Sequence, residues 1–161
     1  MTGIIILCRY NSARLPGKIL KEINGKTIQF INGMAANDPV STLQIWKFIL
    51  DRYPSESGTC IFFNSRDDRP SRTQQMIELT LRDIKPDHFI VRGDKISSLI
   101  ERHRHQSPNT KIDIVALDDP IEFLIELFEK VTKDTLVYAI GNQVGAGQKI
   151  LELISTYRFY G

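Results

Sequence analysis

Short apolar runs rich in β-branched and aromatic residues alternate along the chain with longer segments whose apolar residues recur every three or four positions. The first pattern predicts buried strands, and the second predicts amphipathic helices. Because the two kinds of segment alternate, the sequence predicts an α/β fold with a mostly parallel sheet that helices cover on both faces. The strands are expected at residues 3–8, 18–23, 27–32, 59–64, 88–92, 111–115 and 135–140.

The N-terminal part departs from this parallel pattern. Asn24-Gly25 lies between the second and third predicted strands. This dipeptide is typical of two-residue hairpin turns, because both central positions of such a turn need a positive φ. We therefore expect an N-terminal antiparallel hairpin at the edge of a mostly parallel sheet.

Two of the predicted helices begin with aspartate followed by proline, at Asp38-Pro39 and Asp119-Pro120. An aspartate side chain can cap the free N–H groups of a first helical turn, and proline has the φ angle that this turn requires. Further helices are expected after Arg69-Pro70, over residues 95–105 and from 147 to 158.

The helical period also predicts which helix residues face the core. Trp46 is expected in the core and not at a ligand, because it shares a stripe with other apolar residues of the first helix. The residues expected on the buried faces of the first and fourth helices are Leu43, Trp46, Ile49 or Leu50, Tyr53, Ile121, Leu124, Leu127, Phe128 and Val131.

Size and charge narrow the classes of function. The chain has 161 residues, the usual size of one domain, and a net charge of +2 from 21 basic and 19 acidic residues that are spread along it. No nucleic-acid partner is therefore expected. The longest apolar run, 4–8, is far too short to cross a bilayer, and the N-terminus lacks the order of a signal peptide. We expect a cytoplasmic protein without membrane insertion.

Cysteine and histidine offer no reactive or metal-binding set. Cys8 and Cys60 lie inside apolar runs, where a thiol usually behaves as a small buried hydrophobe. His88, His103 and His105 lack the further ligands of a metal site and are expected on the solvated surface. No hydrolase signature such as G-x-S-x-G is present, so no catalytic residue is assigned.

Polar loops follow three of the predicted strands. In open α/β sheets the ligand crevice lies beyond the carboxyl ends of the strands, so these loops are the first candidates for a binding site. The first loop places Asn37 and Asp38 at a helix N-terminus, where side chains and free N–H groups can bind a carboxylate or a phosphate. Helix capping by Asp38 alone is the alternative interpretation.

The second loop carries two arginines and two aspartates. A guanidinium fork suits the recognition of a carboxylate or phosphate, whereas a solvated turn whose acids cap the next helix is the alternative. The candidate substrate-binding residues of this loop are Asn64, Arg66, Asp67, Asp68 and Arg69.

The third loop is rich in glycine and joins a strand to a helix, so that its backbone N–H groups can approach an anion. Its candidate residues are Gly141, Asn142 and Gly145. The loop matches neither the phosphate-loop motif nor the full dinucleotide motif, and tight turns alone also explain its glycines.

In this order the three loops resemble a known family. The stretches F-I-N-G-M-A-A-N-D-P-V-S-T-L-Q-I-W-K (30–47), F-N-S-R-D-D-R-P-S-R-T-Q-Q (63–75) and V-Y-A-I-G-N-Q-V-G-A-G (137–147) are similar to the C-terminal domain of the ligase subunit of poly-γ-glutamate synthase, a relative of the Mur ligases. The resemblance implies a Rossmann-like three-layer sandwich. It assigns residues 27–161 to this domain and leaves 1–26 as a separate N-terminal strand and hairpin segment.

The resemblance also implies a function. In Mur ligases a central domain carries the phosphate loop and makes an acyl phosphate from ATP and a carboxylate, while the third domain closes over it and positions the incoming amine. Asn37 stands near the histidine of their Y-A-H-x-P motif, and Asp67, Asp68 and Arg69 resemble their G-G-D-R loop. This likeness implies a substrate-positioning domain of a γ-glutamyl ligase for capsule synthesis, which holds glutamate through Arg66 or Arg69.

Several expectations about cofactors and partners follow from that resemblance. The glycine-lysine phosphate motif of the family is missing from this sequence. We therefore expect ATP and Mg²⁺ only in a complete ligase, a central ATP-binding domain as the partner, and no turnover by the isolated chain. A cytoplasmic location, including a place in a membrane-associated synthase complex, is expected.

A second resemblance supports a different class of function. The segment I-I-I-L-C-R-Y-N-S-A-R-L-P-G-K-I-L (4–20) is similar to the start of cytidylyltransferases for surface polysaccharides, which implies nucleotide binding by Arg9, Ser12, Arg14 and Lys18. A nucleotidyltransferase fragment and a non-catalytic nucleotide-binding module are thus the alternatives. Binding of CTP favours the former, and binding of ATP or a dinucleotide without a partner favours the latter.

Overall fold

The protein folds around one six-stranded sheet with the strand order β1-β2-β6-β3-β4-β5. The computed structural model describes residues 18–23, 26–36, 38–53, 57–132 and 134–156. A π-helical turn (Thr80–Ile84) continues α2, and a 3-10 turn (Arg104–Gln106) follows α3. The other elements are β1 (Lys18–Ile23), β2 (Lys26–Asn32), α1 (Pro39–Arg52), β3 (Thr59–Asn64), α2 (Pro70–Leu79), β4 (His88–Arg92), α3 (Ser97–His103), β5 (Lys111–Val115), α4 (Pro120–Lys130), β6 (Leu136–Gly141) and α5 (Ala146–Thr156).

The pairing of β2, β6, β3, β4 and β5 is parallel throughout, which confirms the predicted mostly parallel sheet. β1 runs antiparallel to β2, in a register from Lys18 opposite Ile31 to Ile23 opposite Lys26. The predicted turn residues Asn24 and Gly25 and the strand expected at 3–8 lie outside the described residues. The hairpin as a whole therefore stays a prediction.

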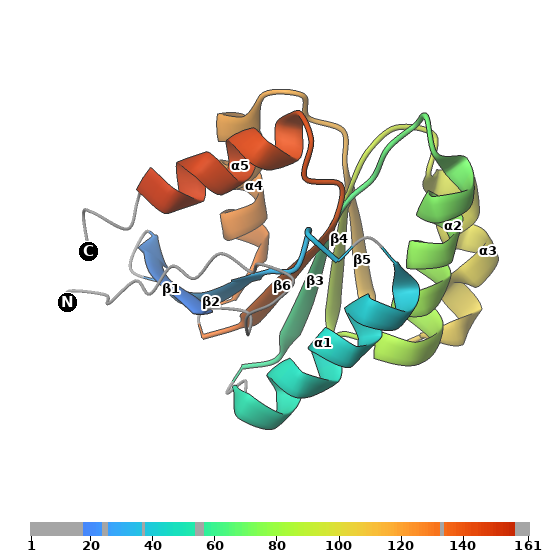
Figure 1. The fold of residues 1–161 in the computed structure, drawn as a ribbon, viewed down its shortest axis with the longest axis horizontal. Coiled ribbons are helices and arrows are strands. Elements are labelled where there is room, and N and C mark those ends of the chain that lie inside the picture. Colours follow the sequence, from blue (N-terminus) through green and yellow to red (C-terminus); the bar gives the residue numbers. More distant parts are fainter. Residues whose placement is uncertain (1–17, 24–25, 37, 54–56, 133, 157–161) are drawn as a thin grey trace.

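Helices cover both faces of the sheet, as the three-layer prediction requires. Figure 1 shows α1, α2 and α3 on one face and α4 and α5 on the other. Alternate residues of a strand point to opposite faces, so that in β3 Phe63 joins the cluster under α1 and α2, while Phe62 joins the cluster under α4 and α5. The sheet is thus buried on both sides.

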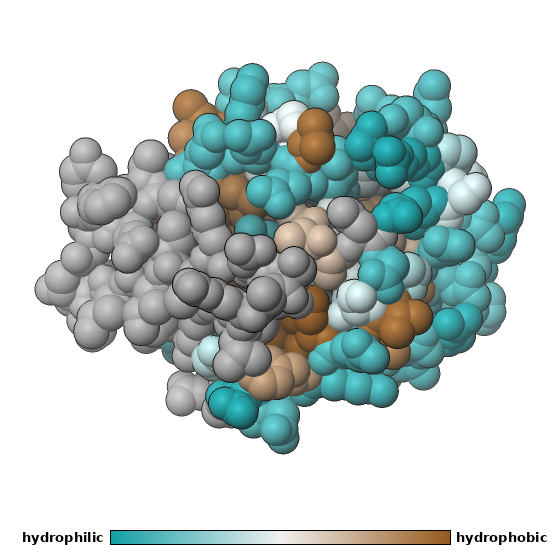
Figure 2. Space-filling model, in the orientation of Figure 1, coloured by the Kyte–Doolittle hydropathy of each residue, from teal (hydrophilic) through white to brown (hydrophobic). Residues whose placement is uncertain are grey.

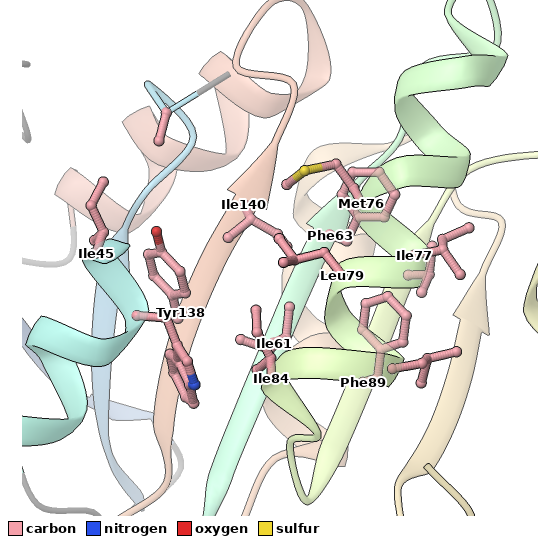
Figure 3. Close-up of a cluster of buried hydrophobic side chains, with 14 of the residues drawn as sticks. Ile45, Ile61, Phe63, Met76, Ile77, Leu79, Ile84, Phe89, Tyr138 and Ile140 are labelled. Carbon is pink, nitrogen blue, oxygen red and sulfur yellow. The ribbon is translucent and has the colours of Figure 1, made fainter. Parts of the chain in front are cut away.

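The cluster on the first face is built around Tyr138, which comes from the central strand β6 (Figure 3). Trp46 of α1 stacks on this tyrosine with a distance of 5.7 Å between the ring centroids. In Figure 3, Phe63 of β3 and Met76 of α2 continue the same cluster toward the right of the view. The prediction that Trp46 belongs to the core is confirmed.

The predicted inner face of α4 is wrong at its first residue. Ile121 is 53% exposed, whereas Phe123 and Leu124 are buried. The buried stripe of α4 is centred on Phe123, Leu124 and Leu127, and Ile121 precedes Phe123 by two positions, about 200° around a helix of 3.6 residues per turn. The apolar character of Ile121 therefore did not show on which side of α4 its side chain lies. In α1 the open choice between Ile49 and Leu50 is decided for Ile49.

The surface placement predicted for the histidines is wrong for two of the three. His103 is only 8% exposed, because it lies on the buried side of α3. His88 lies within 2.6 Å of the carboxylate of Asp113, on the neighbouring strand β5. Cys60 matches its interpretation as a buried hydrophobe, and its burial raises the pKa of the thiol well above the ordinary value. Cys8 lies outside the described residues.

Asp38 caps α1 as predicted, with its carboxylate accepting a hydrogen bond of 2.8 Å from the backbone N–H of Ser41. This bond is the main cause that lowers the pKa of Asp38 below 3.8. Asp38→Ala is expected to reduce the free energy of unfolding by about 1 kcal/mol at pH 7.

The same cap predicts a dependence on pH. Because the folded pKa is lowered, the stabilisation by ionised Asp38 is present above the ordinary pKa of 3.8 and is lost as the pH falls through the lower folded value. Asp38→Asn retains an acceptor oxygen without a charge and serves as the control. Urea unfolding of the wild-type protein and both variants at pH 7 and pH 3 checks this. A difference in stability between the wild-type protein and Asp38→Asn that does not change with pH contradicts it.

Candidate functional site

A cavity of about 460 Å³ opens at the carboxyl ends of β2, β6 and β3. The strand order explains its position. Because β6 lies between β2 and β3, the loop that follows β6 lies between the loops that follow the other two strands. The described residues that line the cavity are Met34, Ala35, Ala36, Phe63, Asn64, Arg66, Arg69, Arg72, Thr73, Met76, Gly141, Asn142, Gln143, Val144 and Gln148.

The cavity has an apolar floor and a positively charged side. Three arginines, Arg66, Arg69 and Arg72, contribute to the lining, and no Asp or Glu is among the described residues that line it. Arg69 and Arg72 flank the first residues of α2, where free backbone N–H groups add partial positive charge. Figure 2 shows hydrophilic residues gathered over the upper right of the molecule, where α2 begins in Figure 1.

The carboxylate of Asp68 is bound to Arg66 in a bidentate pair. The Nε of Arg66 donates to one carboxylate oxygen at 2.7 Å, and its Nη2 donates to the other at 2.5 Å. This hydrogen bonding raises the pKa of Arg66 and lowers that of Asp68. Thr73 fixes the backbone of the same loop, because its hydroxyl donates to the carbonyl of Arg66 at 3.1 Å. The guanidinium group of Arg66 is thus already arranged for a carboxylate.

The glycine-rich bend after β6 forms the central part of the rim. Gly141 has a φ of +97°, a conformation that residues with a Cβ rarely adopt. Asn142 then closes a short turn, because its side-chain oxygen accepts from the N–H of Val144 at 3.2 Å and its amide nitrogen donates to the carbonyl of the same residue at 3.0 Å. The bend therefore has a defined shape.

The bend is attached to β3 at two points. The N–H of Asn142 donates to the carbonyl of Asn64 at 2.9 Å, and the side-chain amide of Asn64 donates to the carbonyl of Asn142 at 2.7 Å. The side chain of Asn64 lines the cavity, but both ends of its amide are engaged in hydrogen bonds within the protein. Its predicted role as a direct ligand contact stays a prediction.

Five of the predicted binding residues line the one cavity, and they come from two of the predicted loops. They are Asn64, Arg66, Arg69, Gly141 and Asn142.

Other predicted residues lie elsewhere. Asp38 caps α1, Asp68 pairs with Arg66, and Gly145 is not among the described residues that line the cavity. Asp67 lines a smaller cavity of about 140 Å³ on the other side of β3. Asn37 lies outside the described residues, so the first loop is represented at the cavity by its neighbours at 35–36.

Most residues of the alternative nucleotide site lie outside the part of the chain that the structure describes. Arg9, Ser12 and Arg14 lie outside the described residues, and Lys18 is the first residue of β1, with no description of its side chain.

Several residues at the cavity were not predicted. Arg72 lies in the first turn of α2, three positions after Arg69, so its closeness in sequence to the charged loop was a usable signal. Gln143, Val144 and Gln148 follow the glycine bend without a motif of their own. Arg92, which does not line the cavity but hydrogen bonds to Asn64 from β4, had no sequence signal.

Within the described ranges, no group of three or more His, Cys, Asp or Glu residues is arranged to hold a metal ion. In the same part of the chain, no helix combines the length and the apolar character needed to cross a membrane.

Comparison with known proteins places these features in a family. Residues 19–157 match the model of the poly-gamma-glutamate synthase CapB C-terminal domain. The PGA synthase CapB of Bacillus subtilis (strain 168) is 32% identical over 131 residues, which cover 80% of this chain and 33% of the relative. The capsule biosynthesis protein CapB of Bacillus anthracis is 29% identical over 125 residues, which cover 78% of this chain and 27% of the relative. The match thus spans between about a quarter and a third of the length of these curated relatives.

A solved structure supports the fold. The MurF ligase from Thermotoga maritima, determined in complex with ADP, superposes with a TM-score of 0.51 and 16% identity, over 88% of this chain and 31% of that one. At this identity the likeness concerns the fold alone, and it agrees with the expected Rossmann-like sandwich. Because the family model covers residues 19–157, the chain belongs to the family of poly-gamma-glutamate synthase CapB C-terminal domains.

Proposed function

We propose that this chain is the substrate-positioning C-terminal domain of an ATP-dependent γ-glutamyl ligase that works in poly-γ-glutamate and capsule synthesis. The observation that carries the proposal is the cavity of about 460 Å³, which three arginines line and to which the loops after β2, β3 and β6 all contribute. Family membership supports the same reaction class, since the relatives are a PGA synthase and a capsule biosynthesis protein.

The cavity suits an amino acid that carries carboxylates. Its volume of about 460 Å³ lies in the range of small-molecule sites. In the proposal, the carboxylate of glutamate is held by Arg69 and by Arg66, which exchanges its internal partner Asp68 for the ligand. A guanidinium group is suited to this exchange, because it offers parallel N–H donors to two carboxylate oxygens.

The other groups of the rim orient the substrate. Asn142 and Gln143 also line the cavity, and the backbone of the bend is held by β3. A fixed substrate orientation converts an encounter between amine and activated carboxylate into an intramolecular step. Residues 35–36 complete the rim from the side of α1.

Activation of the acid is assigned to a part outside this chain. The sequence has no glycine-lysine phosphate loop, so in the proposal a central ATP-binding domain supplies ATP and Mg²⁺ and forms the acyl phosphate. Closure of the present domain over that centre excludes water from the labile intermediate. ATP consumption places the reaction in the cytoplasm, either free or in a membrane-associated synthase complex.

Reconstitution tests the proposal. The ATP-binding part of a poly-γ-glutamate synthase is combined with this chain, and the release of ADP is followed with and without L-glutamate. We expect glutamate-dependent release that requires both parts, because neither part holds both substrates. Hydrolysis of ATP by this chain alone, or ADP release that is the same without the chain, contradicts the proposal.

A further inference from the structure

Asn64 lines the cavity and is only 1% exposed. Its amide nitrogen donates to the carbonyl of Asn142 at 2.7 Å, and its amide oxygen accepts from Nη1 of Arg92 at 3.2 Å. A carbonyl can only accept and a guanidinium can only donate, so these partners leave one orientation for the amide. Asn64 therefore connects Arg92 with the glycine-rich bend.

Arg92, at the end of β4, is itself held by the loop between β5 and α4. Its Nε donates to the carbonyl of Leu117 at 3.0 Å, and its Nη2 lies 3.6 Å from a carboxylate oxygen of Asp118. The side chain is 14% exposed, so water competes only weakly for these donors. One planar group thus spans from the β5–α4 loop to the amide of Asn64.

We propose that Arg92 is a positioning residue for the cavity, which acts through Asn64 to hold Asn142 and the rest of the glycine-rich bend in the shape that receives the substrate carboxylate. The use of this shape for a carboxylate rests on the proposed function, whereas the mechanical link from Arg92 to the bend does not. The guanidinium group does not line the cavity of about 460 Å³ and has no substrate contact in this proposal.

The backbone of Arg92 is fixed independently of its side chain. The N–H and the hydroxyl of Ser65 both donate to the carbonyl of Arg92, each at 2.9 Å. Parallel pairing with Asn64 of β3 and Val115 of β5 holds the same residue in the sheet. A change restricted to the side chain should leave the strand in place and act on the bend.

Arg92→Lys is the informative substitution, because lysine retains the positive charge but cannot reach Leu117 and Asn64 with one rigid fork. Arg82→Lys is the matched control, since Arg82 pairs with Glu78 and Asp83 on the surface away from the cavity. Amide hydrogen exchange is measured at Asn142 and Val144. In Arg92→Lys we expect exchange at these two amides to be about tenfold faster, because one charge-assisted hydrogen bond is lost. In Arg82→Lys we expect unchanged exchange.

Hydrogen exchange at the backbone amides of β6 shows whether the effect of Arg92→Lys is confined to the glycine-rich bend. If Arg92 served only the general stability of the fold, exchange would rise at Val137 and Ile140 by the same factor as at the bend. That outcome overturns the proposal, as does unchanged exchange at Asn142 and Val144.

A double-mutant cycle tests whether Arg92 acts through Asn64. The probe is L-glutamate, and its dissociation constant is measured for the chain with Arg92→Lys, Asn64→Ala and both. We expect each single variant to weaken binding about tenfold and the double variant to be no weaker than Asn64→Ala, because the acceptor of the link is already absent. Fully multiplicative effects overturn the link through Asn64.

The two experiments separate failure of the inference from failure of the proposed function. If the wild-type chain binds no L-glutamate, this result contradicts the proposal that the cavity receives a carboxylate. The exchange measurement still decides whether Arg92 holds the bend.

Discussion

Replacing Gly141 with alanine is expected to lower the free energy of unfolding by roughly 2–5 kcal/mol, from an unfavourable backbone conformation and overpacking together. Gly141 has a φ of +97°, and a Cβ there would lie 2.5 Å from the carbonyl oxygen of Asn64 and 2.6 Å from the ring of Phe63. The carbonyl is the same one that accepts the N–H of Asn142. The added methyl group therefore forces apart the two strands that carry the rim, and L-glutamate binding should be lost as well.

Gly145→Ala is the matched control within the same bend. Gly145 also has a positive φ, +73°, but a Cβ there would have no heavy atom within 4 Å outside its chain neighbours. Only the conformational cost of about 1–2 kcal/mol remains. Urea unfolding of the three proteins measures the difference. Equal losses for the two variants would contradict the close packing of Gly141 against Asn64.

Removing two charges from the cavity is expected to weaken the binding of L-glutamate about a hundredfold, because two guanidinium groups that can hydrogen bond to its carboxylate are lost. The variant is Arg66→Met with Arg69→Met. Methionine keeps an unbranched apolar stem, so that the loss is mainly that of the guanidinium groups. Both side chains line the cavity beside the start of α2. Isothermal titration at low and moderate salt measures the effect.

Two control pairs separate charge from geometry. Arg102→Met with Arg104→Met removes the same charge from exposed positions of α3 and the turn after it, and should leave affinity unchanged. Arg66→Lys with Arg69→Lys retains the charge without the fork and should recover only part of the affinity. Equal losses for the exposed pair and the cavity pair would indicate a general effect of net charge and contradict a specific site.

Most of the fold could be predicted because its signals are local. Aspartate followed by proline marks the starts of α1 and α4, and the apolar runs of β3, β4 and β6 are buried on both faces, as expected for a central parallel strand. The position of the cavity agrees with the same pattern, because polar loops after parallel strands gather at one edge of the sheet. Arg66 and Arg69, which were predicted in this way, line that cavity, and their role toward a ligand stays a prediction.

Several errors and omissions concern interactions that the local sequence pattern does not reveal. Arg92 is joined to Asn64 across 28 positions of sequence, and to Leu117 across 25, so no local motif marks it. His103 is buried by the packing of α3 on its neighbours, which its own polarity did not reveal. The pairing of Asp68 with Arg66 was also not predicted, and the predicted role of Asp68 as a ligand contact stays a prediction. Such pairings depend on side-chain geometry that sequence spacing does not determine.

The proposed function requires that the loops after β2, β3 and β6 form one receptor for a carboxylate. The most direct measurement is a titration of the isotope-labelled chain with L-glutamate, followed through the chemical shift of every backbone amide. We expect saturable shifts at 35–36, 64–73 and 141–148 together, and we expect these shifts to disappear in the variant Arg66→Met with Arg69→Met. Shifts confined to one of these loops, or gathered along α4 and β5, would contradict it.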